Sequence, residues 1–139
     1  MNQEATQPGR TEPNVVFARA MYAVETRRHH LAVAIDMRDS EAIAHTARSA
    51  ADIWLAGRSA CRRLIARSNS PSPYADAARR LLDENYMTLM ELFARATRVI
   101  AIPRTQKVMQ EVRAMLMTAM ASPIDASPFA MKQDTLKCP

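Results

Sequence analysis

The chain has 139 residues, of which 48% are hydrophobic and only two are glycine, and its formal net charge is +5. This length fits one domain with its own core, and two glycines are too few to build the loops that most active sites use. The dominant residues (Ala, Leu, Met, Arg and Glu) lose least on entering a helix, so we predict an all-α fold: an amphipathic helical bundle, or extended helical hairpins, of about four helices.

The two ends of the chain differ from its middle. Residues 1–13 lack apolar content, so we expect a disordered N-terminal arm. Residues 122–139 mix Pro, Ser, Asp and Lys with few apolar residues, which favours a flexible tail. A single helical domain is therefore expected over residues 14–121.

The first helix is expected from about Asn14 to Met37. Its apolar residues step by three and four, with Arg28 where another apolar residue would fit: Phe17, Met21, Val24, Leu31 and Ile35. Two good capping residues, Asp39 and Ser40, follow, and the apolar stripe shifts by one residue there. Either the helix breaks at this point or one long rod continues; we favour the break.

The second helix combines small residues with one large one. Ala47, Ala50 and Gly57 allow a neighbouring backbone to approach closely, and Trp54 is the one large side chain of its apolar stripe. Residues 69–73 read Asn-Ser-Pro-Ser-Pro and must end this helix, because the residue before each proline is pushed out of helical geometry.

The two remaining helices carry the widest apolar stripes. We expect the third over about 73–100, ~42 Å long, and the last from a Thr105 cap to about Ala121, after Pro103. The residues that we predict to form the association face, called the seam residues below, are Leu82, Asn85, Leu89, Leu92, Phe93, Val108, Val112 and Leu116.

Asn85 lies in the middle of this stripe, and a buried polar residue at such a position fixes the register of associating helices. Four of the ten methionines lie between residues 109 and 120. Methionine packs against irregular apolar surfaces, so ordinary core filling and contact with an apolar partner have equal weight here.

Two polar groups suggest other functions. The basic patch of Arg58, Arg62, Arg63 and Arg67 fits an anionic partner, but it lacks interleaved aromatic residues, and a solvated helix face is the favoured reading. His29, His30 and His45 suggest a metal site, and Glu25 and Glu41 each lie four residues before a histidine. The spacing matches neither di-iron nor zinc patterns, so we expect no metal and no cofactor.

Cysteine usage and hydropathy bear on location. Cys61 and Cys138 are too few for a disulfide framework, and free thiols in a reducing compartment are the favoured state. No charged-then-apolar leader begins the chain, and no apolar run approaches the ~20 residues of a membrane-spanning helix. We expect a cytoplasmic protein without a transmembrane segment.

Residues 83–120 resemble the phasins, small helical proteins that coat polyhydroxyalkanoate granules. The resemblance rests on the Asn-containing start Glu84–Asn85–Tyr86, the apolar run after it, a short break, and a helix that opens Val108–Met109–Gln110. It implies a protein that has no enzymatic activity, often self-associates, and covers a hydrophobic polymer with its apolar helix faces while its charged residues face water.

The sequence therefore predicts a non-catalytic, phasin-like protein that binds a hydrophobic granule surface or self-associates as a homo-oligomer through its amphipathic helices. The alternative is a basic helical protein that binds nucleic acid or another anionic partner. An enzyme or metal carrier that uses the histidines ranks last.

Overall fold

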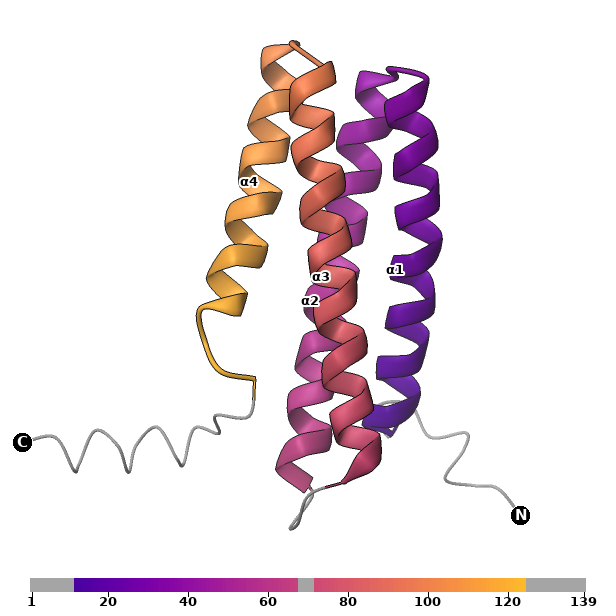
Figure 1. Cartoon of the computed structure of the whole chain (residues 1–139), viewed down its shortest axis with the longest axis vertical. Helices are drawn as coiled ribbons and strands as arrows, with labels where there is room; N and C mark the ends of the chain where they lie inside the picture. Colours follow the sequence, from indigo (N-terminus) through magenta and orange to yellow (C-terminus); the bar gives the residue numbers. More distant parts are fainter. Residues whose placement is uncertain (1–11, 68–71, 125–139) are drawn as a thin grey trace, which may run out of the picture.

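Four helices make up nearly all of the structure, a computed structural model that describes residues 12–67 and 72–124. They are α1 (Pro13–Asp36), α2 (Ser40–Arg67), α3 (Pro73–Val99) and α4 (Pro103–Met120). Consecutive helices run in opposite directions, so α1 is parallel to α3 and α2 is parallel to α4 (Figure 1). The predicted all-α helical bundle is confirmed. Residues 1–11 of the predicted arm and 125–139 of the predicted tail lie outside the described residues, whereas Pro13, the last residue of the predicted arm, is the first residue of α1.

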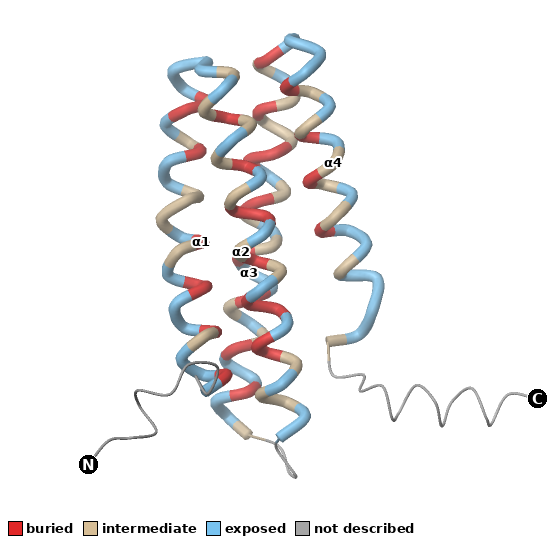
Figure 2. Tube along the Cα trace, turned by 180° about the vertical axis from the view of Figure 1, so that it is seen from behind, coloured by how far each residue is buried: buried red, intermediate tan, exposed pale blue. Residues whose placement is uncertain are grey.

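The two middle helices form the centre of the bundle. α2 and α3 contact each other, and each of them also contacts both α1 and α4. Within the described residues α1 and α4 do not touch, because they lie on opposite sides of the α2–α3 pair (Figure 1). Buried positions follow the inner side of every helix (Figure 2).

The predicted break between the first two helices is confirmed, and the backbone turns out of the helix at Arg38. Arg38 has a φ of 53°, in the left-handed region where glycine usually ends a helix. The amide of Asp39 donates to the carbonyl of Ala34, and that of Arg38 to the carbonyl of Ile35, both at 3.0 Å. The Asp39 side chain then caps α2 by accepting from the amide of Ala42 at 3.1 Å.

The close approach of α1 and α2 depends on Gly57, as the sequence predicts. A Cβ atom at this position would lie 2.6 Å from Cε of Met21 and 3.1 Å from Cβ of Ala20. Both distances are too short for ordinary contact, so a side chain at residue 57 would displace the end of the Met21 side chain and require Ala20 to move by a few tenths of an ångström.

A proline is the first residue of each of the last two helices, Pro73 in α3 and Pro103 in α4. The side chain of Ser72 caps α3 by accepting from the amide of Ala75 at 3.4 Å. For α4, the expected Thr105 cap is wrong: Pro103 is the first helical residue, Ile102 precedes it, and Thr105 is buried inside the helix. Proline fits the first turn because that turn has no use for its missing amide hydrogen.

Trp54 joins the centre of the bundle. Its side chain is fully buried, and its Nε1 donates to the carbonyl oxygen of Leu82 on α3 at 3.0 Å. Its ring centroid lies 5.7 Å from that of Tyr86, also on α3. A large apolar side chain with one satisfied polar atom thus ties α2 to α3.

We expect Arg38→Gly to be more stable than Arg38→Ala by about 1 kcal/mol. Both variants lose the hydrogen bond from Nη1 of Arg38 to the carbonyl of Val99, and only glycine avoids the steric cost of a Cβ atom at positive φ. Urea unfolding measures the difference. Met37, with φ −84°, is the matched control, since alanine should be the more stable of the two there. The same order at both positions would contradict the argument.

Candidate helix-association surface

The seam residues lie inside this bundle. Seven of the eight are buried, and Val108 is partly buried against the core. Those on α3 pack toward α1, α2 and α4, and those on α4 pack toward α2 and α3. The predicted face therefore packs within one chain in this structure, and it becomes available to a partner only if a helix leaves the bundle.

Asn85 is fully buried and connects α3 to α1. Its Oδ1 accepts from Nη1 of Arg28 at 2.7 Å, and its Nδ2 donates to the carbonyl of Leu81 at 3.0 Å. If α1 slid along α3, the hydrogen bond between the charged Arg28 and the buried Asn85 amide would break. The buried amide oxygen would then lack a donor, which costs free energy. The polar residue therefore fixes the register of helices within the chain.

α4 is attached mainly by a few inward side chains. Met109, Val112 and Leu116 are each fully buried. Nη2 of Arg48 on α2 pairs with Oε1 of Glu111 at 2.6 Å, an exposed bridge of modest energy. Nε2 of Gln106 donates to the carbonyl oxygens of Thr97 at 3.3 Å and Ile100 at 2.9 Å, which holds the start of α4 to the end of α3.

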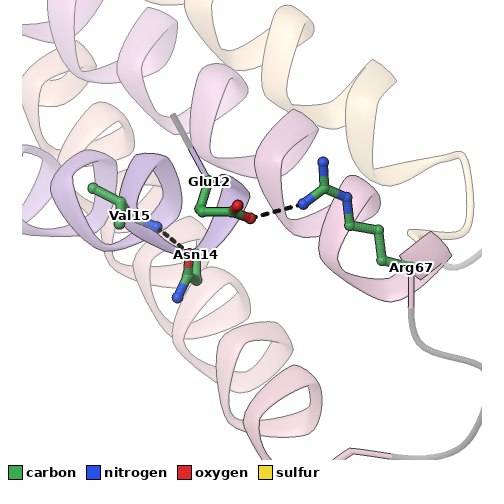
Figure 3. Close-up of polar contacts among 4 residues, drawn as sticks. All are labelled: Glu12, Asn14, Val15 and Arg67. Atoms are coloured by element: carbon green, nitrogen blue, oxygen red, sulfur yellow. Dashed lines mark hydrogen bonds and ion pairs between the residues drawn. The ribbon is translucent and has the colours of Figure 1, made fainter. Parts of the chain in front are cut away.

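The four arginines of the predicted basic patch do not form one surface. Arg58 is buried, and its Nη2 donates to the carbonyl of Ser122, just after α4. Arg67 points the other way, where its Nη1 pairs with Oε1 of Glu12 at 2.9 Å, just before α1 (Figure 3). Arg62 is partly buried and Arg63 exposed. Burial, with the charge of Arg62, lowers the pKa of Arg58 from its usual range.

The histidines do not assemble. His29 and His30 are both exposed on α1, while His45 lies on α2 in a groove beside α4. In the part of the chain that the structure describes, no three His, Cys, Asp or Glu side chains are placed to hold a metal ion. Over the same residues, no helix combines the length and hydropathy needed to cross a bilayer.

Among the hollows on the outside of the described bundle are two grooves that lie between parallel helices. The larger, of about 880 Å³, lies between the first halves of α2 and α4 and includes Glu41, Arg48, Arg104 and Val108. The smaller, of about 370 Å³, lies between the first halves of α1 and α3, with the exposed Tyr22 and Tyr74 at its edges. Neither groove gathers a nucleophile, a base and an oxyanion donor.

Comparison with protein-family models, curated proteins and solved structures finds no match for this chain. Its function therefore has to be argued from the bundle itself.

Sequence reasoning missed the polar contacts between helices, and two of them show why. Arg28 interrupts the apolar stripe of α1, and Asn85 interrupts the apolar stripe of α3. The sequence shows each interruption, but it does not show that the two side chains form a hydrogen bond. Arg48 and Glu111 are separated by 63 positions and lie on different helices, so no local spacing could connect them.

We expect Asn85→Ala to lower the free energy of unfolding by about 2–3 kcal/mol, because it leaves Arg28 without its acceptor and opens a small cavity. Arg28→Met keeps the apolar stem and removes the charge. Urea unfolding of the two single variants and the double variant completes a double-mutant cycle. The loss of unfolding free energy in the double variant should be clearly smaller than the sum of the losses in the two single variants. Additive effects would mean that the two side chains are not coupled.

Burial raises the pKa of the Cys61 thiol above its usual value, and the nearby Asp83 carboxylate adds to this. The unfolded thiol therefore ionises first, so the contribution of Cys61 to stability is complete below about pH 8.5 and is lost as the pH rises further. In a Cys138→Ser background, the stability advantage of Cys61 over Cys61→Ala in urea unfolding should shrink between pH 7 and alkaline pH. A constant difference would contradict the shift.

Proposed function

We propose that this chain is a non-catalytic, phasin-like protein that covers a hydrophobic polymer granule with amphipathic helices, and that α4 is the helix that moves onto the surface. In the closed bundle the apolar faces cover one another. At a granule, α4 leaves α2 and α3 and buries the same face against the polymer. The observation that carries this proposal is the way α4 is attached.

α4 has the smallest share in the core. It contributes four buried residues, against eight or nine in each of the other helices. Within the described residues it has no contact with α1, and its packing contacts are with α2 and α3 alone. Its release therefore leaves the contacts among α1, α2 and α3 in place.

α4 also exposes apolar side chains near its two ends. Met117 is 55% exposed and Met120 is 37% exposed, and Ile102, just before the helix, is 49% exposed. These residues give a hydrophobic surface a first contact while the bundle is still closed. Released, the helix adds Met109, Val112 and Leu116 to that contact.

For α4 itself, the transfer exchanges one apolar contact for another, and the surface must also cover the residues of α2 and α3 that α4 leaves exposed. Each of the three inward side chains loses about 1.5–3 kcal/mol of burial when α4 leaves the bundle, and regains a similar amount on the polymer. The exposed methionines add burial that the closed bundle does not have. Arg104 and Lys107 give the side of the helix opposite Met109 and Leu116 the basic character that is typical of helices lying in an interface.

The test is binding to polyhydroxybutyrate particles with α4 either locked or free. Arg48→Cys with Glu111→Cys, in a Cys61→Ala and Cys138→Ser background, places two thiols where α2 and α4 meet, and a short bismaleimide joins them. We expect the free protein to sediment with the particles in both low and high salt. The locked protein should lose at least about tenfold in affinity, a free-energy difference of about 1.4 kcal/mol.

A matched lock controls for the crosslinker. Arg27→Cys with Ser49→Cys joins α1 to α2 at a contact of 3.1 Å and leaves α4 untouched, so this variant should bind like the free protein. Equal binding by both locked forms would rule out the movement of α4. Absence of particle binding, or retention of DNA that salt abolishes, would instead favour the anionic-partner alternative.

A further inference from the structure

The outer face of the α2–α4 pair has a charge pattern that is complementary to itself. The 880 Å³ groove continues into a second hollow of about 640 Å³, and Arg48 lines both. The second hollow includes Leu55 on α2 and Met115 on α4. Together the two hollows form one face, called the α2–α4 face below, which extends along α2 from Glu41 to Leu55 and along α4 from Arg104 to Thr118.

The Arg48–Glu111 bridge sets the register of this face. Because α2 and α4 are parallel, stepping back seven residues, about two turns, from each partner brings Glu41 level with Arg104. The first level thus has an acid on α2 and a base on α4, and the second has a base on α2 and an acid on α4. Neither Glu41 nor Arg104 has an ion-pair partner within residues 12–67 and 72–124.

Apolar groups fill the space between the charged levels. Ala44 on α2 and Val108 on α4 line the groove near the first level, and the 49% exposed Ile102 lies at its upper end. Leu55 and Met115 repeat this composition below the Arg48–Glu111 bridge. The face therefore combines an apolar strip with paired charges at its edges, a composition found at protein interfaces.

We propose that a second copy of this chain docks on the α2–α4 face as a parallel two-fold dimer, with α2 of each copy over α4 of the other. The two-fold axis lies between the two copies and is parallel to the groove, so it places α2 of each copy opposite α4 of the other. Glu41 of one copy then faces Arg104 of the second copy, and Arg48 faces Glu111 of the second copy. Each of these four charged residues meets its opposite, the apolar strips meet each other, and Asp52, which also lines the groove, lies level with Met115.

The antiparallel dimer matches charges over a shorter length. Glu41 can face Arg48 of a second copy only if the axis lies between these two levels. Leu55 of one copy would then lie beyond the first residue of the other copy's α2, so the lower half of the face would stay uncovered. The parallel arrangement covers ~21 Å of each helix from residue 41 to residue 55.

Charge exchange tests the dimer without any hydrophobic surface, so its outcome is separate from that of the proposed function. Glu41→Arg places two arginines opposite each other at both symmetry-related contacts of the first level, and Arg104→Glu places two glutamates there. By sedimentation velocity, the native chain should dimerise, and each single variant should have a dimer Kd at least about tenfold weaker. An equimolar mixture of the two variants should regain the dimer, because both cross-contacts are then attractive.

Two controls make the result specific. Arg80→Glu and Glu84→Arg change exposed charges on α3 outside this face, and both variants should dimerise like the native chain. Glu41→Arg is unfavourable at the start of α2 whereas Arg104→Glu is favourable at the start of α4, so a shared loss of the dimer cannot come from helix stability. A folded native monomer at all concentrations, unaffected single variants, or a mixture that stays monomeric would each overturn the proposal.

Discussion

The bundle depends on how Trp54 is buried between α2 and α3. Its ring occupies the centre of the core, its Nε1 hydrogen is satisfied by the Leu82 carbonyl, and Tyr86 packs beside it. One turn further along α2, Gly57 leaves room for Met21 of α1. The largest and the smallest residues of one helix thus determine where two other helices lie, and α4 is added to a framework that they have already fixed.

Much of this arrangement could be predicted from the sequence because it depends on local signals. Proline at residues 73 and 103, the Asp39 cap and the apolar periods of each stretch set the helix boundaries to within a few residues. The prediction for Gly57 was also local, since a glycine within an apolar stripe has no other use there. The Thr105 cap was wrong because Pro103 starts the helix two residues earlier and turns Thr105 inward.

The association face was harder to predict because periodicity shows which side of a helix is apolar and not what covers it. Leu89 and Phe93 have the same pattern whether they contact another chain or their own α1 and α2. The basic patch has the same ambiguity: the four arginines lie close in sequence, but Arg58 and Arg67 are about two and a half turns apart, so Arg58 contacts Ser122 just after α4 and Arg67 contacts Glu12 just before α1. Only the arrangement of helices decides these questions.

The separation of α1 from α4 has a consequence for how this protein tolerates change. Since the two helices touch only α2 and α3, free-energy effects of substitutions on their outer surfaces should add without coupling. A substitution on the outer surface of α1 then requires no compensating substitution on α4, and the reverse also holds. Substitutions along the outer surface of α4 can then change what this flank binds without disturbing the packing of α1 on α2 and α3.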